Sequence, residues 1–376
     1  MKSPVGSVLL AVCLNFSCNS AYSATCFAPP VEVPTLEQGS DIVVGDVNND
    51  GFPDFIVSYC QGQGGTVDLG NGDGTFRHSL INRMSPGAYG LALADFNHDG
   101  NMDLAAAYGG GGCLSGSRAE LLLGNGDGTF QAEKKYWSGK EPISLAPGDF
   151  NNDGQLDLLV DDILDGTHYL FFGNGDGTLR HGTRIANAQP PFFGQWSKAT
   201  DFNKDGNLDF VYLSDKNSYS LVISLGHGDG TFGKHFSYPG GFFAVADLNL
   251  DGKVDILVVS VLGGSSQMTV LLGNGDGSMT ALAPVSVPYQ TNPAIGDLNN
   301  DGVPDVVYAN GRFANLSFRF GVGDGTFRDQ MLTYAKVSQL VKLADFNQDG
   351  LLDILSWTGG LTTRGVNVMF NAGQCH

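Results

Sequence analysis

A nine-residue pattern, Asp-x-Asn-x-Asp-Gly-x-x-Asp, constrains this chain more than any other feature because it occurs seven times. A repeat that fills nearly a whole sequence takes precedence over any estimate of domain number from its length. We therefore expect one repeat domain over residues 25–376 rather than two or three ordinary domains. The copies begin at Asp46, Asp95, Asp149, Asp201, Asp247, Asp297 and Asp345.

A second signature, related to Leu-Gly-Asn-Gly-Asp-Gly-Thr-Phe, follows six of the seven copies. Asn-Gly and Asp-Gly between apolar runs favour tight hairpins, since such turns need positive φ angles. The chain has 54 glycines and no collagen-like triplet period, so we assign the glycines to turns. The signature occupies residues 69–76, 123–130, 172–179, 225–232, 272–279 and 320–327.

Each repeat unit has room for about four short strands. An apolar alternating segment such as 90–94 precedes each Asp-rich loop, and a β-rich run such as 256–260 follows it. A third run ends at the glycine signature (268–272), and a fourth follows it (232–238). No segment has the 3.6-residue periodicity of a long helix. Short strands repeating about every 50 residues predict an all-β, seven-bladed β-propeller of four-stranded blades.

The two ends of the sequence predict how the ring closes. Only two strands follow the last Asp-rich loop, and residues 369–375 then match the start of a glycine turn. Residues 25–27 match the end of that turn, and residues 28–34 supply a further strand. We therefore expect the N-terminal strand to complete the seventh blade.

The cysteines fit this closure. Cys26 and Cys375 fall where the split turn would be continuous, so we predict a disulfide between them, the alternative being two free thiols. The chain-entropy model assigns about 4–5 kcal/mol to closing so long a loop. Cys60 and Cys113 follow the second strands of neighbouring blades and form the second predicted pair.

Residues 1–24 have the features of a signal peptide. Lys2 supplies a positive charge, residues 8–14 form a short apolar run, and residues 21–23 form a small-x-small cleavage site. A lipid-attachment site at Cys13 is disfavoured, since Val12 is bulky where a small residue is needed. We expect the protein to be secreted and extracellular, or periplasmic or on the cell surface in a bacterium. No other stretch approaches 18 apolar residues, so we expect no membrane insertion.

The Asp-rich loops have the residues that calcium requires. Calcium takes six to eight oxygens, and such loops offer side chains at positions 1, 3, 5 and 9 and a carbonyl at position 7. Val57 occupies position 12 of the first loop, where an EF-hand needs Glu, and strands rather than helices flank it. The sequence predicts about seven structural Ca²⁺ ions, held by Asp46, Asn48, Asp50, Asp54, Asp95, Asn97, Asp99, Asp103, Asp149, Asn151, Asp153, Asp157, Asp201, Asn203, Asp205, Asp209, Asp247, Asn249, Asp251, Asp255, Asp297, Asn299, Asp301, Asp305, Asp345, Asn347, Asp349 and Asp353.

The alternative is an Asp-rich turn held by side-chain to backbone hydrogen bonds. Three carboxylates within nine residues, seven times over, repel one another unless a cation is present. The net charge of −19, with only 20 Lys and Arg, also argues against a nucleic-acid partner. The Asp of the glycine signature, such as Asp73, is interpreted as a turn former rather than a ligand.

Both motifs resemble the FG-GAP family of repeats, also called VCBS repeats, over residues 27–376. The family includes the N-terminal propeller of integrin α subunits, so the resemblance implies a seven-bladed propeller with calcium in its hairpin loops. Some integrin blades lack the metal, whereas all seven loops keep every ligand here. Integrin function does not carry over, since only the propeller is matched. Certain fungal and bacterial lectins are also similar to this repeat.

We interpret the chain as a binding or adhesion module for an extracellular glycan or protein. The candidate ligand face lies opposite the calcium loops, because its connections carry aromatic residues, which stack on sugars and anchor partners. The alternative for most of them is packing between blades. An enzyme such as a polysaccharide lyase or hydrolase is disfavoured, since no metalloprotease, nucleophile-elbow or Cys–His motif is present; a scaffold without a small ligand is the third alternative. The candidate aromatics are Tyr89, Trp137, Phe193, Trp196, Phe242, Tyr289 and Trp357.

Overall fold

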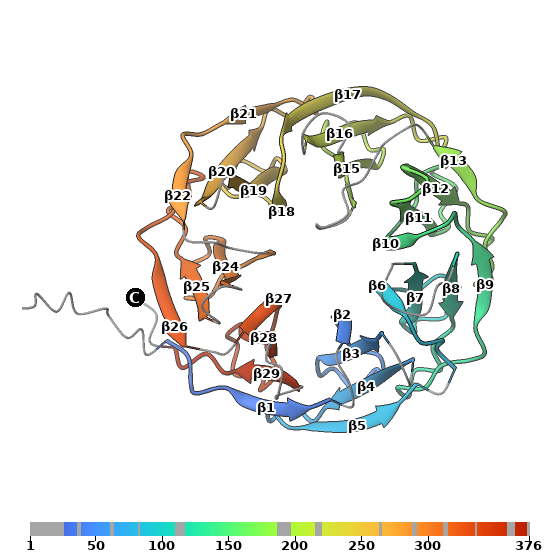
Figure 1. Cartoon of the computed structure of the whole chain (residues 1–376), viewed down its shortest axis with the longest axis horizontal. Coiled ribbons are helices and arrows are strands. Elements are labelled where there is room, and N and C mark those ends of the chain that lie inside the picture. Colours follow the sequence, from blue (N-terminus) through green and yellow to red (C-terminus); the bar gives the residue numbers. More distant parts are fainter. Residues whose placement is uncertain are drawn as a thin grey trace, which may run out of the picture.

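The strands form seven antiparallel sheets arranged as blades around a common axis (Figure 1). The sheets confirm the predicted all-β, seven-bladed propeller, and the described residues include no helix. The structure is a computed structural model that describes residues 26–35, 39–60, 64–81, 83–109, 117–185, 197–214, 220–262, 265–287, 292–310, 315–334, 337–358 and 365–373.

In the first to sixth blades four strands pair in chain order, from the axis outward, and the fifth blade has an extra strand, β22, on β20. The seventh blade has the order β27-β28-β29-β1. The first blade contains β2 (Gly39–Gly45), β3 (Asp54–Tyr59), β4 (Gly65–Gly70) and β5 (Phe76–Leu80); the second β6 (Ala88–Ala94), β7 (Asp103–Tyr108), β8 (Arg118–Leu122) and β9 (Lys134–Trp137); the third β10 (Pro142–Gly148), β11 (Asp157–Asp162), β12 (Thr167–Phe171) and β13 (Thr183–Ile185). The fourth contains β14 (Lys198–Thr200), β15 (Asp209–Ser214), β16 (Ser220–Gly226) and β17 (Phe232–Pro239); the fifth β18 (Phe242–Ala246), β19 (Asp255–Leu262), β20 (Ser265–Gly273), β21 (Met279–Ala281) and β22 (Val285–Val287). The sixth contains β23 (Pro293–Gly296), β24 (Asp305–Asn310), β25 (Asn315–Arg319) and β26 (Met331–Tyr334); the seventh β27 (Val337–Ala344), β28 (Asp353–Thr358), β29 (Gly365–Met369) and β1 (Val31–Pro34).

The hydrophobic core lies between neighbouring blades. The second strands β3 and β7 are buried at every position, whereas the outer strand β5 is mostly exposed. One cluster joins Phe55 and Val57 of the first blade to Leu355 and Val368 of the seventh. Strands covered on both faces read as continuous apolar runs, which explains why the second strands of all units look alike in the sequence.

The N-terminal segment completes the seventh blade, as predicted. Strand β1 pairs antiparallel with β29, and Phe27 bridges Asn371. The Ala372 amide donates to the Cys26 carbonyl over 2.7 Å, and in the intact turn of the first blade Asn71 makes the same bond to Thr75 over 3.0 Å. Two chain ends therefore rebuild the turn that one continuous segment makes elsewhere.

Candidate functional site

The connections between strands lie at two ends of the blades. The Asp-rich loops, which join first to second strands, share one end with the glycine turns, because the Gly70 amide donates to the Asp54 carboxylate over 2.7 Å. We call this end the loop face. The opposite face is formed by the connections from second to third strands and from one blade to the next.

Each Asp-rich loop is held by hydrogen bonds from its own backbone. In the first loop, Asp46 accepts from the Gly51 amide over 2.8 Å, and Asp50 accepts from the Phe52 amide over 2.9 Å. The Asn48 amide group donates to Asp50 over 2.8 Å. The two bonds from backbone amides recur in all seven loops.

The fourth position of each loop has a left-handed backbone, with φ between 56° and 61°. Sequence reasoning missed this feature, although Asn, which tolerates that conformation, occupies the position in three loops. The geometry directs the side chain to the next loop: Asn49 donates to Asn101 over 2.7 Å, and Asn152 donates to Asn207 over 2.7 Å. His98 and Gln348 also bond to the next loop, so in four loops the fourth position links neighbouring blades.

The ninth position connects the two motifs of each blade. The Asp54 carboxylate accepts from the Val47 amide at the loop start and from Gly70 at the glycine turn, and the side chain is fully buried. The same pair of bonds recurs in every blade, with Asn371 in the glycine's place in the seventh. These carboxylates fix the loop against the turn.

The pKa of the ninth-position carboxylate is raised. Burial and, to a lesser extent, the nearby Asp50 and Asp46 carboxylates raise the pKa of Asp54 to about 6. The two backbone hydrogen bonds lower this pKa but do not offset the effect of burial. The same causes raise the pKa of Asp103, Asp157, Asp209, Asp305 and Asp353 to about 6, and that of Asp255 in direction. A cation beside these groups would relieve the repulsion.

The donors match calcium in kind, since all four predicted side chains of a loop offer oxygens and three of them are carboxylates. The positions of these side chains do not yet form a coordination site. Within the part of the chain that the structure describes, no group of three or more His, Cys, Asp or Glu side chains is gathered so as to hold a metal ion. The loops hold the predicted residues at one place in each blade, and their oxygens bond to amides.

The Asp of the glycine signature lies in the turn itself. Asp73 accepts from the amide and the hydroxyl of Thr75, over 3.0 and 2.6 Å. These bonds lower its pKa. Asp73 therefore acts in this structure as the turn former that its sequence position indicates.

The candidate aromatics of the opposite face have different environments. Trp137 is 56% exposed, Tyr89 and Phe242 are half-buried on inner strands, and Trp357 is 7% exposed and packs in the core beside Val57. The expectation of an accessible ring is therefore not supported at Trp357. Phe193, Trp196 and Tyr289 lie outside the described residues.

Trp137 belongs to a polar and aromatic patch between the second and third blades. Its ring packs edge-on against Tyr169, with centroids 5.5 Å apart. The Tyr169 hydroxyl donates to Asp165 over 3.3 Å, and Lys140 pairs with the same carboxylate at 2.7 Å. The Arg184 guanidinium donates to the Asp165 carbonyl over 3.4 Å. We call these five residues the Trp137 patch.

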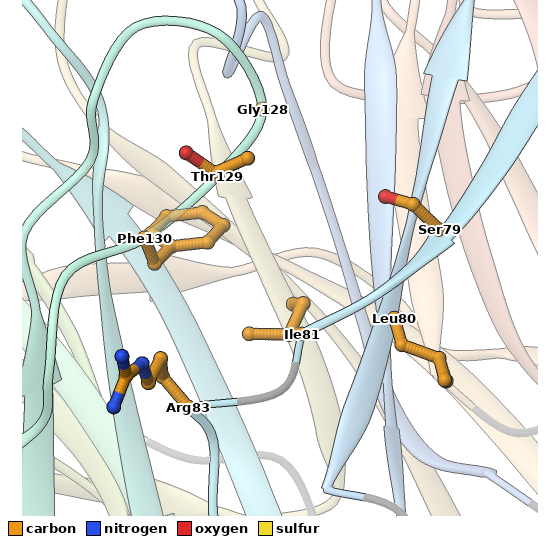
Figure 2. Close-up of a pocket in the computed structure, with 7 residues that line it drawn as sticks. All are labelled: Ser79, Leu80, Ile81, Arg83, Gly128, Thr129 and Phe130. Atoms are coloured by element: carbon orange, nitrogen blue, oxygen red, sulfur yellow. The ribbon is translucent and has the colours of Figure 1, made fainter.

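A cleft of about 180 Å³ lies between the first and second blades, where Ile81 and Phe130 converge (Figure 2). In the second and fourth blades the position equivalent to Ile81 is Tyr136 or Tyr238, whose hydroxyls accept from an amide of the next blade's turn over 3.1 and 2.7 Å. Ile81 is too short and apolar to make that bond. The cleft therefore lies where the first blade lacks the tyrosine that the second and fourth blades have at this position.

One cluster contains the residue types of a serine hydrolase triad. Asp161 accepts from both His168 Nδ1, at 2.6 Å, and the Ser197 hydroxyl, at 2.8 Å. The other ring nitrogen of His168 is buried and has no hydrogen-bond partner among the described residues, and the ring packs against Phe210 and Tyr212. A nucleophilic serine must donate to the histidine, so this cluster is not arranged for acyl transfer.

The predicted disulfides extend beyond the described residues. Cys26 is buried at 2% exposure, whereas Cys113 and Cys375 lie outside the described ranges, as does the signal peptide predicted over residues 1–24. The pairings Cys26–Cys375 and Cys60–Cys113 stay predictions. In the described part of the chain, no helix is long and apolar enough to cross a membrane.

The fold and its loops define a repeat-built β-propeller. Its sequence matches the model for the FG-GAP-like repeat over residues 46–106, 112–160, 201–258, 247–308 and 297–356. These matches cover more than half of the chain, which therefore belongs to the FG-GAP-like repeat family. A comparison with curated proteins found no match.

Three solved structures are similar in fold. A lectin from Agrocybe aegerita, described as recognising non-reducing terminal N-acetylglucosamine, is 17% identical over 78% of this chain and 80% of its own, with a TM-score of 0.54. The WD40 domain of Toxoplasma gondii coronin is 11% identical over 92% and 87%, with a TM-score of 0.56. A protein from Lactobacillus plantarum is 14% identical over 86% and 95%, with a TM-score of 0.53. At these identities the likeness concerns the fold.

Proposed function

We propose that this protein is an exported, calcium-stabilised binding module that recognises a saccharide at the Trp137 patch. The observation that carries the proposal is the exposed Trp137 ring, supported by Tyr169 and bordered by Lys140, Asp165 and Arg184. An exposed aromatic ring stacks on the apolar face of a sugar, and the charged groups around it bond to hydroxyls. The Agrocybe aegerita lectin supports the proposal, since it uses a similar fold for a saccharide.

The proposed calcium ions have a structural role. The support for them is the set of seven loops with three carboxylates each, whose ninth-position Asp is buried and repelled by the others. Binding requires the loop side chains to converge further than they do in this structure. At extracellular affinities and about 1 mM calcium, each site would add about 0.4–1.4 kcal/mol to the free energy of unfolding.

The proposed disulfide clasp would keep the seventh blade closed outside the cell. In the rebuilt turn, Cys26 takes the place of Thr75, the fifth residue after Gly70, and Cys375 falls four residues after Asn371, the equivalent of Gly70. Continued to Cys375, this register would make the two cysteines neighbours across the break. Disulfides persist in oxidising compartments, which agrees with export.

A glycan array probed with the calcium-loaded protein tests the saccharide proposal. We expect binding to at least one saccharide class, with a loss of tenfold or more in Trp137→Ala. Leu250→Ala is the matched control, because Leu250 is 53% exposed and lies in an Asp-rich loop on the loop face. Binding that survives Trp137→Ala would contradict the location of the site. An array without signal, together with capture of an extracellular protein that depends on Trp137, would favour a protein ligand instead.

A further inference from the structure

Only three charged side chains lie on the innermost strands of the propeller. These are Asp41 on β2, Lys198 on β14 and Lys342 on β27, while β6, β10, β18 and β23 contain none. The innermost strands surround the common axis (Figure 1). In a chain with a net charge of −19, the described innermost strands therefore contain two cations and one anion.

The two lysines occupy the same layer. Each lies three residues before the first Asp of its loop, Asp201 or Asp345. Three residues of strand span about 10 Å, which sets the depth of both lysines below the loop face. They belong to the fourth and seventh blades, with two blades between them on one side and three on the other, so their strands lie on roughly opposite sides of the axis. The other blades have Val43, Ala92, Ala146, Ala244 and Ala294 at this position.

Neither lysine has a hydrogen bond or an ion pair with another described residue. The Lys198 side chain is exposed and Lys342 is half-buried, so both amines are accessible. Although solvent reaches the Lys198 side chain, the surrounding blades remove part of its hydration, which lowers its pKa. The Lys342 ammonium lowers this pKa further, whereas the Asp41 and Asp161 carboxylates raise it. The two amines are thus close enough to repel each other.

The Asp41 carboxylate is hydrogen-bonded to backbone amides. Its carboxylate oxygens accept from the Ile42 amide over 2.8 Å and the Leu91 amide over 2.9 Å. Asp41 lies within electrostatic range of both lysines, and Asp161 lies within range of Lys198, but both carboxylates accept hydrogen bonds from other groups and neither bonds to a lysine amine. A tetrahedral or planar oxyanion between the amines would supply charge-assisted hydrogen bonds to both.

We propose that a small oxyanion of the sulfate, phosphate or carboxylate class binds on the axis of the propeller between Lys198 and Lys342. The site is separate from the Trp137 patch and uses no residue of the Asp-rich loops. Its occupant would tie the fourth blade to the seventh, two blades that share no core cluster.

Isothermal titration of sodium sulfate into the full-length protein, in calcium buffer at constant ionic strength and pH 7, tests the proposal. We expect one sulfate to bind per chain, about tenfold more weakly after Lys198→Ala or Lys342→Ala and not measurably in the double variant. Both variants should fold, because four other blades have Ala at this position. Lys204→Ala, which removes an exposed lysine from an Asp-rich loop, is the matched control and should bind like the parent protein.

The melting temperature provides a second measurement. Sulfate stabilises folded proteins without binding, so the quantity of interest is the difference between parent and double variant. We expect 10 mM sulfate to raise the melting temperature of the parent by a few degrees more than that of the double variant. No heat of binding in the parent, or equal binding in the double variant, would overturn the proposal. Either result would leave the saccharide proposal intact, because the glycan array measures that site.

Discussion

The loop face and the opposite face of this propeller are built differently. On the loop face, seven loops repeat the same backbone bonds, and each ninth-position Asp is bonded to its own blade's turn. On the opposite face the connections differ: residues 163–166 join β11 to β12 in a tight hairpin, whereas residues 109–117 join β7 to β8. The difference indicates that the loop face stabilises the fold, whereas the connections of the opposite face can vary and so can form a ligand site.

The pH dependence of stability in the absence of calcium should reveal the loop face most strongly. Six ninth-position carboxylates have a folded pKa of about 6 and an ordinary unfolded value near 3.8, so their protonated forms favour the folded state. Their contribution is full below pH 3.8 and is lost as the pH rises through 6. The unfolding free energy in EGTA should fall by several kcal/mol in total between pH 4.5 and 7.5.

Urea unfolding at a series of pH values, with and without calcium, measures this effect. Carboxylates with a lowered pKa, such as Asp99 and Asp205, have the opposite effect, because they lose their stabilising contribution when the pH falls. The pH of maximum stability without calcium should therefore lie near 4–5. Calcium should move the optimum toward neutral pH. A calcium-free protein that is most stable at pH 7.5 would contradict the proposed repulsion.

Replacing a ninth-position Asp should be more damaging than replacing a fifth-position Asp in the same loop. Asp209→Ala leaves the buried amides of Phe202 and Gly226 without acceptors, at a cost of about 3–5 kcal/mol. Asp205→Ala removes exposed bonds and should cost under about 1 kcal/mol in EGTA. Equal losses in urea unfolding would show that the ninth-position bonds to the turn are not special.

Removing the proposed clasp tests whether the seventh blade closes as the others do. Cys26→Ser should lower the unfolding free energy by about 4 kcal/mol under oxidising conditions, because the long loop is no longer closed. The control is the same comparison under reducing conditions, where parent and variant should be equally stable because both predicted disulfides are broken in each. Peptide mapping that finds Cys26 free in the oxidised parent would exclude the pairing.

The smallest expected effect concerns the left-handed position of the fifth loop. Leu250 has a φ of 61° and is 53% exposed, so its side chain gains little from burial. Leu250→Asn should raise the unfolding free energy by about 0.5–1 kcal/mol, since Asn tolerates this conformation. Asn49→Leu in the first loop is the reverse experiment and should be destabilising, because it also removes the bond to Asn101.

Much of the fold could be predicted from the sequence, because the two motifs fix the phase of every blade. The split seventh blade followed from the same phase, and Phe27 and Asn371 meet as expected. The double role of Asp54 and the left-handed position of Asn49 were missed, since a ligand pattern does not reveal which amides face a carboxylate. Trp137 and Trp357 could not be distinguished from the sequence, because exposure depends on the neighbouring blade.

The central claim is that the Asp-rich loops hold calcium and thereby stabilise the propeller. Differential scanning calorimetry of the oxidised protein at pH 7.5, in 1 mM calcium and then in EGTA, tests it most directly. We predict that the melting temperature falls on the order of 10 °C in EGTA and recovers when calcium is restored. A melting temperature that is the same in both buffers would contradict the claim and leave the loops as turns held by their own hydrogen bonds.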